Sequence, residues 1–453
     1  MKKSSLKIDV VILAAGMGTR MKSEIPKVLH PLLGKPMVEY IFQAVKELVS
    51  DPAVVVVGNK AKMVEETLGD QARYVLQEPQ LGTAHAVQCA REMLKGKSDI
   101  VLVANSDFPL ITTETYRKLV QTHIESGNTL TISTVVAEDP RGFGRILRDK
   151  DGRIVRIVEE KAATSEQKKI RELNSNPYCF AADWLWEALG RVEKSEVGEY
   201  YLTDLVEIAY KEGLKIGSIE IRDHEEAIGI NNRVHLAEAS KALQRRINEK
   251  WMLAGVTMID PEKVYIEDTV TIGHDTVLYP EVYLRGDTHI GECCEIGPSV
   301  LVKNTTIGDR CRLLFAMLES AKLDNDVDMG PFGHLRRGAH LGDHVHMGNF
   351  GEVKNSYLGQ GTKMGHFSYL GDAEIGANVN IGAGTITCNY DGEKKHKTVI
   401  GEDAFIGSDT MLVAPVGIGK GAKTGAGAVV NHDVPDEETW VGIPAKKLKK
   451  KKE

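Results

Sequence analysis

The sequence predicts two domains of different fold class, an α/β domain of Rossmann-like type followed by a parallel β-helix. The chain has 453 residues, more than a single hydrophobic core usually organises. Apolar strand-like runs alternate with helix-like stretches in the first half, whereas a six-residue repeat occupies the second half. The change from one pattern to the other indicates where the first domain ends.

The α/β prediction covers residues 8 to about 230. A strand-like run at residues 10–13 is followed by a helix near 37–49, a second strand at 53–58 and a second helix near 60–68. This alternation is typical of a parallel sheet with helices on both faces. The run at 10–13 follows a short basic start, as in a signal peptide, but it ends in a glycine-rich turn. We therefore interpret it as the first strand of the sheet.

One helix is predicted between the two domains. Apolar residues recur there at helical spacing among many charged ones, at Leu236, Leu243, Ile247 and Trp251. We therefore assign residues 1–232 to the first domain, 233–252 to a linker helix and 253–453 to the second domain.

The second domain is predicted from aliphatic residues that recur every six positions. The unbroken series is Ile266, Ile272, Leu278, Leu284, Ile290 and Ile296. After one-residue shifts the repeat returns at Leu335, Leu341, Met347 and Val353, and again at Ile400, Ile406, Leu412 and Ile418. A period of six corresponds to three short strands per coil, with the aliphatic side chains stacked inside. The polar segment 388–398 breaks the period and is expected to form a loop on one face.

Composition restricts the function classes. Hydrophobic residues make up 42% of the chain, and no apolar run reaches the roughly 18 residues that a membrane span needs. The net charge of -7 offers no argument for nucleic-acid binding, and the lysine-rich tail at 446–452 is interpreted as a solvated end. The six cysteines lack CxxC spacing and are expected to be reduced thiols, mostly in the core. We expect a cytoplasmic protein without a membrane span or a nucleic-acid partner.

A glycine-rich segment, LAAGMGTRMKSEIPK at residues 13–27, follows the first predicted strand. Gly16 and Gly18 would let backbone N–H groups approach phosphate oxygens, while Arg20 and Lys27 could neutralise the phosphate charge. The spacing fits neither the Walker loop nor the GxGxxG motif. The segment therefore predicts a phosphate-binding loop of another type, the alternative being an ordinary glycine turn with basic surface residues.

The first half resembles the sugar-1-phosphate nucleotidyltransferases. Its motif order is most similar to one half of the bifunctional N-acetylglucosamine-1-phosphate uridyltransferase/glucosamine-1-phosphate N-acetyltransferase family. The resemblance is carried by PKVLHPLLGKPM (26–37), QEPQLGTAHA (77–86), SDFPLI (106–111), GFGRI (142–146), VEEKAA (158–163) and GINN (229–232). It implies a nucleotidyltransferase fold and the transfer of a uridylyl group from UTP to a sugar phosphate, with release of pyrophosphate.

The same resemblance implies roles for individual residues. Asp107 and Asn231 would hold Mg²⁺, a hard cation that prefers oxygen ligands and usually takes the rest of its shell from water and substrate phosphates. Gly144, Glu159 and Asn174, together with Asn231, would contact the sugar. The residues implied to bind the nucleotide, with glutamine amides reading the uracil, are Leu13, Ala14, Ala15, Gly16, Arg20, Lys27, Gln77, Gln80, Gly82 and Thr83.

The second half resembles the acetyltransferase half of the same family along residues 363–392, which implies a left-handed β-helix and a homotrimer with its sites between neighbouring solenoids. His366 would be the general base, taking a proton from the amine of glucosamine-1-phosphate as the amine attacks acetyl-CoA. The residues implied to clamp and orient the sugar phosphate are Arg336, Lys354, Tyr369, Asn380, Asn389, Tyr390 and Lys395. Those implied to line the acetyl-CoA cleft are Ala383, Ser408, Ala426 and, in the tail, Lys446.

Together the two resemblances imply synthesis of UDP-N-acetylglucosamine, a precursor of peptidoglycan and lipopolysaccharide, by acetyl transfer followed by uridylyl transfer. One alternative is a single-activity enzyme whose other domain is weak, altered in sugar preference or regulatory. Another is a scaffold that displays the lysine tail to a partner.

Two departures from the family motifs bear on the first alternative. Asn105 and Ser106 stand before Asp107 in place of the usual Tyr-Gly, and Asn176 followed by Pro177 replaces a glycine and its successor. The proline is expected to push Asn176 toward an extended conformation. We therefore hypothesise a uridyltransferase half that is weaker than usual or altered in its sugar preference.

Overall fold

The computed structural model describes residues 6–49, 51–58, 60–140 and 142–448. It divides into two compact units between Leu243 and Gln244, a point inside the long helix α8 (Arg233–Leu253). None of the helices in the described ranges combines the length and the apolar character that a bilayer crossing requires.

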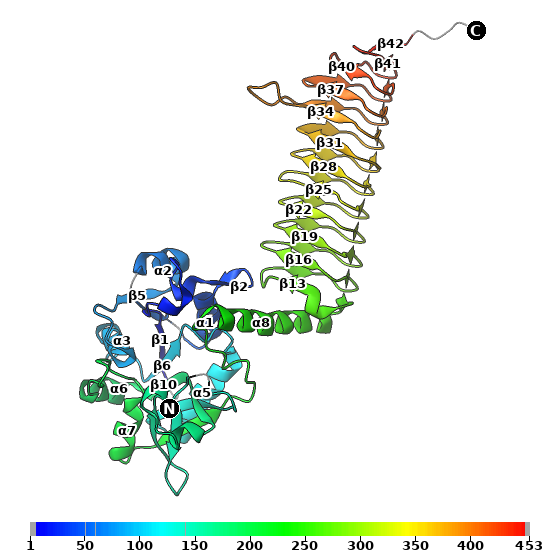
Figure 1. The fold of residues 1–453 in the computed structure, drawn as a ribbon. Coiled ribbons are helices and arrows are strands. Elements are labelled where there is room, and N and C mark those ends of the chain that lie inside the picture. The colour runs from blue at the N-terminus through cyan, green and yellow to red at the C-terminus, as the bar shows by residue number, and fades with distance from the viewer. Residues whose placement is uncertain (1–5, 50, 59, 141, 449–453) are drawn as a thin grey trace, which may run out of the picture. The chain divides into compact units, whose positions relative to one another are not determined.

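The first unit is built on a nine-stranded sheet, shown with its helices in Figure 1. The main path runs through β11 (Ile216–Glu220), β7 (Leu130–Val136), β10 (Glu172–Ala181), β6 (Ile100–Asn105), β1 (Ile8–Leu13), β4 (Val54–Val57) and β5 (Arg73–Leu76). The hairpin of β8 (Arg145–Arg148) and β9 (Ile154–Val158) pairs with β10, while β2 (Pro31–Leu32) and β3 (Lys35–Pro36) form a separate ribbon.

Helices cover both faces of this sheet, as predicted. Side chains of β1, β4 and β6 alternate between two buried clusters, one shared with α1, α2 and α5 and the other with α3, α4, α6 and α7. The α-helices are α1 (Met37–Lys46), α2 (Ala61–Leu68), α3 (Thr83–Cys89), α4 (Arg91–Leu94), α5 (Thr113–Ser126), α6 (Ala182–Ala188) and α7 (Asp204–Lys211). Short 3-10 turns are η1 (Thr19–Met21), η2 (Lys27–Leu29), η3 (Gly69–Gln71), η4 (Glu160–Ala162), η5 (Gln167–Lys169) and η6 (Leu189–Arg191).

The sheet is mixed rather than parallel throughout, because β10 runs antiparallel to both β6 and β7. Strands β5, β4, β1 and β6 are mutually parallel, so their carboxyl ends share one edge. Ligands of open α/β sheets bind at such an edge. The loops that follow β1, β4 and β6 therefore occupy the position where a site is expected.

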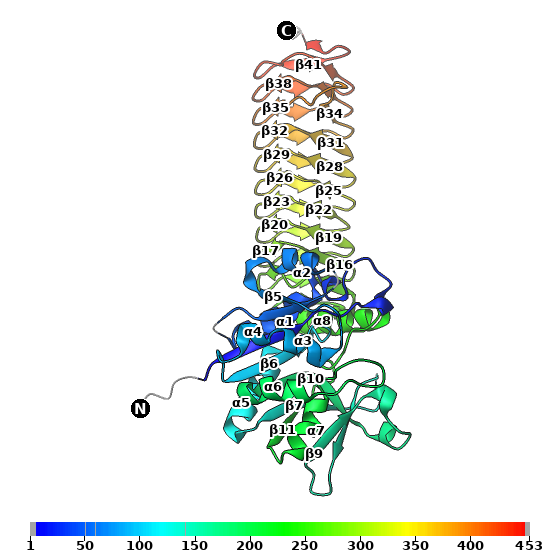
Figure 2. The same cartoon turned by 90° about the vertical axis from the view of Figure 1, so that its left-hand side faces the viewer.

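The second unit is a left-handed parallel β-helix, and its coils stack regularly in Figures 1 and 2. Each coil contributes one short strand to each of three sheets, which are parallel except at the last strand of the first sheet, β42 (Lys446–Lys447), which runs antiparallel to β41 (Thr439–Val441). All the aliphatic repeat residues, from Ile266 to Ile418, are at most 7% exposed, so the six-residue period is confirmed as the inward-facing row of each sheet.

The strands of the β-helix are short and belong to three sheets. The first sheet holds β12 (Thr257–Met258), β15 (Val277–Leu278), β18 (Glu295–Ile296), β21 (Arg312–Leu313), β24 (Asp328–Met329), β27 (His346–Met347), β30 (Lys363–Met364), β33 (Asn380–Ile381), β36 (Phe405–Ile406), β39 (Lys423–Thr424), β41 (Thr439–Val441) and β42 (Lys446–Lys447). The second holds β13 (Val264–Ile266), β16 (Val282–Arg285), β19 (Val300–Lys303), β22 (Met317–Glu319), β25 (His334–Leu335), β28 (Gly351–Lys354), β31 (Ser368–Gly371), β34 (Ile386–Cys388), β37 (Met411–Val413) and β40 (Val429–Val430). The third holds β14 (Thr271–Ile272), β17 (His289–Ile290), β20 (Thr306–Ile307), β23 (Lys322–Leu323), β26 (His340–Leu341), β29 (Tyr357–Leu358), β32 (Ala373–Ile375), β35 (Thr398–Ile400) and β38 (Val416–Ile418).

The first coil of the β-helix is closed by amide side chains of α8 and by the 3-10 turn η7 (Pro261–Lys263). The buried Gln244 and Asn248 both donate to the carbonyl oxygen of Val264, at 2.9 and 3.0 Å. They also reach the carbonyls of Glu262 and Pro261. Because buried carbonyls need donors, these two amides satisfy an edge that would otherwise lose its hydrogen bonds.

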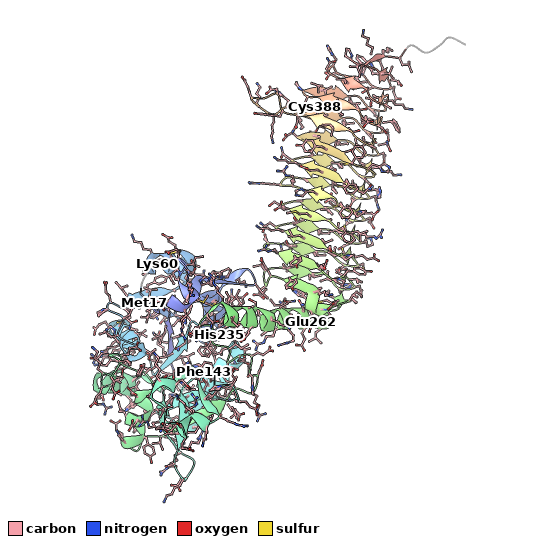
Figure 3. The ribbon with its side chains drawn as sticks, viewed as in Figure 1. Met17, Lys60, Phe143, His235, Glu262 and Cys388 are labelled. Atoms are coloured by element: carbon pink, nitrogen blue, oxygen red, sulfur yellow. The ribbon has the colours of Figure 1, made fainter. Side chains whose placement is uncertain are left out.

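The polar segment 388–398 leaves the stack between β34 and β35, as predicted, and Figure 3 labels its first residue. Its arms are bridged at Tyr390 and Lys395. The Asp391 carboxylate accepts hydrogen bonds from two backbone N–H groups and pairs with His396. These bonds lower the pKa of Asp391, so the loop carries a fixed negative charge at its tip.

All six cysteines are free, as expected, but fewer are fully buried than we expected. The buried ones are Cys179, Cys294 and Cys311, while Cys89 and Cys388 are half-buried and Cys293 is exposed. Cys293 stands in a corner of the β-helix at a left-handed φ of 57°, where its side chain faces solvent.

Candidate active sites

The glycine-rich segment leaves the sheet at the end of β1 and folds back on itself. Gly18 has a φ of 61°, and a Cβ at this position would lie 2.7 Å from the Cβ of Lys27. Glycine is therefore needed for the loop to bring Lys27 beside the strand end. Met17, labelled in Figure 3, is exposed at the tip of the loop.

A cavity of about 300 Å³ lies beside this loop and gathers most of the residues predicted to bind the nucleotide. It is lined by Leu13, Ala15, Gly16, Met17, Lys27, Val28, Gln77, Gln80, Gly82, Thr83, Ala86, Asn105, Ser106, Asp107 and Glu199. Ala14 and Arg20, predicted for the same ligand, are absent from its lining. Glu199 was not predicted, since it lies more than a hundred residues away from the loop and only the tertiary structure brings it there.

The two predicted uracil-reading glutamines hold loops together. The Gln77 Nε2 donates to the carbonyl of Gly82 at 2.9 Å, and the Gln80 Nε2 donates to the carbonyl of Ala15 at 2.6 Å. Gly82 has a φ of 102°, and a Cβ there would come within 2.5 Å of the Tyr200 carbonyl oxygen. The glycine thus allows the segment before α3 to touch the backbone beside Glu199.

The predicted metal ligands Asp107 and Asn231 lie side by side. The N–H of Ile230 donates to the Asp107 carbonyl at 2.8 Å. The Asp107 carboxylate pairs with Lys27 at 2.8 Å, and the Asn231 Oδ1 accepts a 2.8 Å hydrogen bond from Arg20. Each predicted oxygen ligand therefore faces a positive group.

This donor set fits a cation that is held largely by its substrate. Within the described ranges, no group of three or more His, Cys, Asp and Glu residues could hold a metal ion. One carboxylate and one amide oxygen suit Mg²⁺, which usually keeps several waters and binds substrate phosphates. The cations of Lys27 and Arg20 now occupy the positions beside both oxygens.

Three of the four predicted sugar-contacting residues, Gly144, Glu159 and Asn174, also come together, around the side chain of Tyr178. Asn174 donates its backbone N–H to the Gly144 carbonyl at 2.9 Å and its side-chain amide to the Tyr178 hydroxyl at 2.6 Å. The Glu159 carboxylate accepts a 2.9 Å hydrogen bond from Thr203, and burial raises the pKa of Glu159. These residues do not line the 300 Å³ cavity.

The expectation that Asn176 is extended is wrong, because its φ is 71°. The pairing of β10 with β7 shifts register between Asn174 and Tyr178, and the bulge places Asn176 in the left-handed region. Asparagine adopts this region more readily than other non-glycine residues. The geometry of the bulge therefore overrides the ordinary preference of a residue before proline.

A second acidic side chain, Asp204 at the start of α7, lies close to Glu159. Burial, with the charges of Glu159 and Glu207, raises the pKa of Asp204 to about 6. The unfolded chain ionises this group near 3.8, so folding becomes less favourable as the pH rises from about 4 to about 6.

We expect Asp204→Asn to stabilise the first domain at pH 7.5, by roughly 1–2 kcal/mol once the half-exposed position is allowed for. The gain should shrink as the pH is lowered toward 4, where the wild-type group is protonated in both states. Thermal melts at several pH values test this. An equal shift in melting temperature at pH 4.5 and 7.5 would contradict it.

In the β-helix, a cluster of cations occupies one corner of neighbouring coils. Arg336 pairs with Glu352 at 2.9 Å, and Lys395 from the polar loop lies 3.9 Å from Asp372. Lys395, and then Arg336, lower the pKa of Lys354, which shows that the three positive groups are close. Three cations in one corner suit a phosphate dianion.

Tyr369 and Asn389 stand beside the same corner. A Cβ on Gly371 would collide with the Tyr369 hydroxyl and come within 2.8 Å of the Asn389 Nδ2. Asn389 donates to the Asp372 carboxylate at 2.5 Å. The structure thus brings together Arg336, Lys354, Tyr369, Asn389 and Lys395, while Tyr390 is 60% exposed in the loop.

His366 lies at a different corner, which it shares with the predicted acetyl-CoA residues. Hydrogen bonds from Gly384 to Phe367, from Asp409 to Ala383 and from Gly427 to Ser408 link this corner in successive coils. The equivalent residues of these coils are His366, Ala383, Ser408 and Ala426. Asn380 precedes Ala383 on β33, and Lys446 lies in β42.

The His366 corner and the cation cluster are separated by strand β31, which is about 13 Å long at 3.3 Å per residue. In the described part of the chain, no side-chain hydrogen bond or ion pair holds His366, which is exposed. One chain therefore presents the predicted base and the predicted phosphate clamp at opposite ends of the same strand.

The first half is an α/β sheet whose first loop lines a cavity with Lys27 and Asp107, and the second half is a hexapeptide β-helix with a cation cluster. The two together define a two-site transferase of the nucleotidyltransferase class. The family model for nucleotidyl transferases matches residues 9–252, more than half of the chain. Proteins named bifunctional protein GlmU match nearly all of it. The one from Caldanaerobacter subterraneus subsp. tengcongensis is 48% identical over 94% of this chain and 93% of its own length.

Two further relatives carry the same name. The Geobacillus sp. protein is 47% identical over 94% of this chain and 93% of its own length, and the Listeria monocytogenes protein is 46% identical over 94% of each. The chain belongs to the bifunctional GlmU family, and its N-terminal half belongs to the nucleotidyl transferases. It is a bifunctional transferase.

Proposed function

We propose that this protein makes UDP-N-acetylglucosamine in two steps at two separate sites. Acetyl-CoA first acetylates glucosamine-1-phosphate at the β-helix, and UTP then uridylylates the product at the α/β sheet. The observation that carries the proposal is the presence, in one chain, of a cavity lined by Lys27 and Asp107 at the parallel strand ends and of a cation cluster on the β-helix. We assign the first step to residues 253–453, the second to residues 1–232, and both to the cytoplasm.

In the acetylation step the amine nitrogen attacks the thioester carbonyl and loses a proton to His366, while the thiolate of coenzyme A leaves. Arg336, Lys354 and Lys395 hold the phosphate of the sugar. Because His366 and these cations lie at opposite ends of β31, a complete site needs a second chain. We therefore propose a homotrimer in which the clamp of one copy faces the base of another.

An exposed phenylalanine column at the His366 corner supports this assembly. Phe315, Phe332 and Phe350 stack with ring centroids 5.6 and 5.2 Å apart, and Phe367 follows one coil later beside His366. The first three have left-handed φ values of 44–63°, which costs a non-glycine residue about 1 kcal/mol each. Phe315 and Phe332 line a groove of about 640 Å³, and the column is exposed apolar surface of the kind that protein interfaces cover.

We expect the double variant Phe332→Ser/Phe350→Ser to shift the protein from trimer to monomer and to lower acetyl transfer more than tenfold, because interface aromatic residues carry much of the binding energy. Uridylyl transfer should stay within twofold of the wild type. Light scattering after size exclusion and the two assays measure this. Val399→Ser, which removes an exposed apolar side chain from another sheet, is the control. An intact trimer in the double variant would exclude the column from the interface.

In the uridylylation step a phosphate oxygen of N-acetylglucosamine-1-phosphate attacks the α-phosphorus of UTP, and pyrophosphate leaves. The nucleophile is already an anion, so the step needs positioning and neutralisation of charge rather than a general base. Asp107 and Asn231 would hold Mg²⁺, which supplies neutralisation of the phosphate charge. Lys27 and Arg20, released from these two oxygens, would then pair with the phosphates of the nucleotide.

The test is an assay of the purified protein with acetyl-CoA, glucosamine-1-phosphate, UTP and Mg²⁺, with free thiol and pyrophosphate followed separately. Both products should appear, and pyrophosphate release from glucosamine-1-phosphate should depend on prior acetylation. Thiol without pyrophosphate would leave a single-activity acetyltransferase. Pyrophosphate from added N-acetylglucosamine-1-phosphate, without thiol from glucosamine-1-phosphate, would leave a single-activity uridyltransferase. No product from either sugar phosphate would leave only a scaffold.

A further inference from the structure

The bulge in β10 contains a closed triangle of hydrogen bonds between three side chains. The Asn174 Nδ2 donates to the Asn176 Oδ1 at 3.0 Å and to the Tyr178 hydroxyl at 2.6 Å. The Tyr178 hydroxyl in turn donates to the Asn176 Oδ1 at 2.9 Å. The left-handed φ of 71° at Asn176 turns its side chain back toward Asn174 and so makes the triangle possible.

The triangle fixes the orientation of the Asn174 side-chain amide. An amide nitrogen carries two hydrogens, and both are used, one by Asn176 and one by Tyr178. The amide cannot flip without placing its oxygen against the Asn176 oxygen. Asn174 is 3% exposed, and in the described part of the chain its Oδ1 is buried with no hydrogen-bond donor. A buried amide oxygen without a donor is unfavourable, so this atom has capacity for a donor from a ligand.

A second hydrogen-bond acceptor, the Glu159 carboxylate, lies near the Tyr178 side chain of the triangle. Burial raises the pKa of Tyr178, and the negative charge of Glu159 raises it further. The Glu159 carboxylate also accepts a hydrogen bond from Thr203. A carboxylate and an amide oxygen are both acceptors. Together they suit a ligand that presents hydroxyl or amide N–H donors, such as the sugar of a sugar phosphate.

We propose that Asn176 and Tyr178 are positioning residues that lock the Asn174 amide with its Oδ1 free to accept an N–H or O–H of the sugar phosphate. The proposal rests on the uridyltransferase function proposed above and names how its sugar is selected. Glycine is equally able to adopt this backbone conformation, but it has no side chain that could hold Asn174. Asn176 therefore has a role that glycine cannot fill. The oxygen of the Asn176 side chain is the acceptor that holds Asn174.

A separate set of bonds holds the backbone of the bulge. The Ser175 hydroxyl donates to the Ser133 Oγ at 2.8 Å, and Ser133 donates to the Pro177 carbonyl at 3.1 Å. Variants that break the triangle therefore leave these backbone contacts in place. This separation also supplies a matched control, since Ser175→Ala weakens the bulge without touching the triangle.

The experiment measures the Kd of N-acetylglucosamine-1-phosphate by titration calorimetry, and its KM and that of UTP, for Asn176→Gly, Tyr178→Phe and Ser175→Ala in the full-length protein. Loss of one side of the triangle should raise the Kd and KM for the sugar phosphate about tenfold, the effect of one hydrogen bond, with the KM for UTP unchanged. Ser175→Ala should lower the melting temperature and leave the Kd within twofold. In an Asn174→Ala background, Asn176→Gly should have no further effect on the Kd, because it acts through Asn174.

Two outcomes would overturn the positioning role: an unchanged Kd in Asn176→Gly, or a tenfold effect of Asn176→Gly that persists in the Asn174→Ala background. Failure of the proposed function appears differently. A wild type that binds the sugar phosphate but releases no pyrophosphate from UTP would refute the uridyltransferase activity, while the Kd values would still decide the role of the triangle. A wild type that binds no sugar phosphate would overturn both.

Discussion

His366→Ala should lower acetyl transfer by about 10²- to 10⁴-fold, the usual range for loss of a general base. The amine would then have to lose its proton to water while it attacks the thioester. Uridylyl transfer should stay within twofold of the wild type, because it takes place in the other compact unit of the chain. Free thiol and pyrophosphate, followed in the same preparation, give the two rates.

The matched control for this variant is His344→Ala. His344 is an exposed histidine of the same β-helix, but it stands in a different corner of its coil, near Asp326. It should change neither rate. If His366→Ala lowered both activities in a protein that remained folded and trimeric, the two sites would not be independent. If thiol release survived within tenfold, another group would be the base.

Asp107→Ala should lower pyrophosphate release by about 10²- to 10³-fold, the range found when one electrostatic contact to a transition state is removed. On the proposed assignment the variant would leave only Asn231 and substrate oxygens to hold the Mg²⁺, and it also frees Lys27 from its 2.8 Å ion pair. Acetyl transfer should be unaffected. The measurement is the pyrophosphate rate as a function of Mg²⁺ concentration.

Two further variants sharpen this test. Asp107→Asn keeps an oxygen ligand but not its charge, so part of its loss should be recovered at high Mg²⁺. Asp99→Asn, which removes a carboxylate from the other end of β6, where Asp99 accepts a hydrogen bond from the Lys7 backbone, should leave the Mg²⁺ dependence unchanged. Retention of the wild-type rate by Asp107→Ala at ordinary Mg²⁺ would remove Asp107 from the site.

Several features of this protein could be predicted from the sequence because they depend on short-range patterns. The six-residue period requires its aliphatic residues to share one face of each short strand, and Ile266, Leu335 and Ile406 are indeed fully buried. The glycine-rich loop could be located because glycines between a buried strand and two cations are unusual. The loop at 388–398 could be located because it interrupts a repeat.

Other features were decided only by the tertiary structure, because they depend on contacts between distant segments. Glu199 reaches the 300 Å³ cavity beside the glycine-rich loop through the contact between Gly82 and Tyr200. The reversed direction of β10 follows from its place between β6 and β7, which no local pattern reports.

The clearest case is Asn176, for which sequence reasoning and structure disagree. From the sequence alone, the following proline predicts an extended residue, since that preference reflects only neighbouring atoms. In the folded chain the register shift against β7 and the hydrogen bonds to Asn174 and Tyr178 outweigh this local preference, and Asn176 takes a left-handed conformation. Repeating patterns thus determined the two folds of this protein. The orientation of the side chains in the β10 bulge was instead set by tertiary hydrogen bonds, because these can compensate a local conformational cost of about 1 kcal/mol.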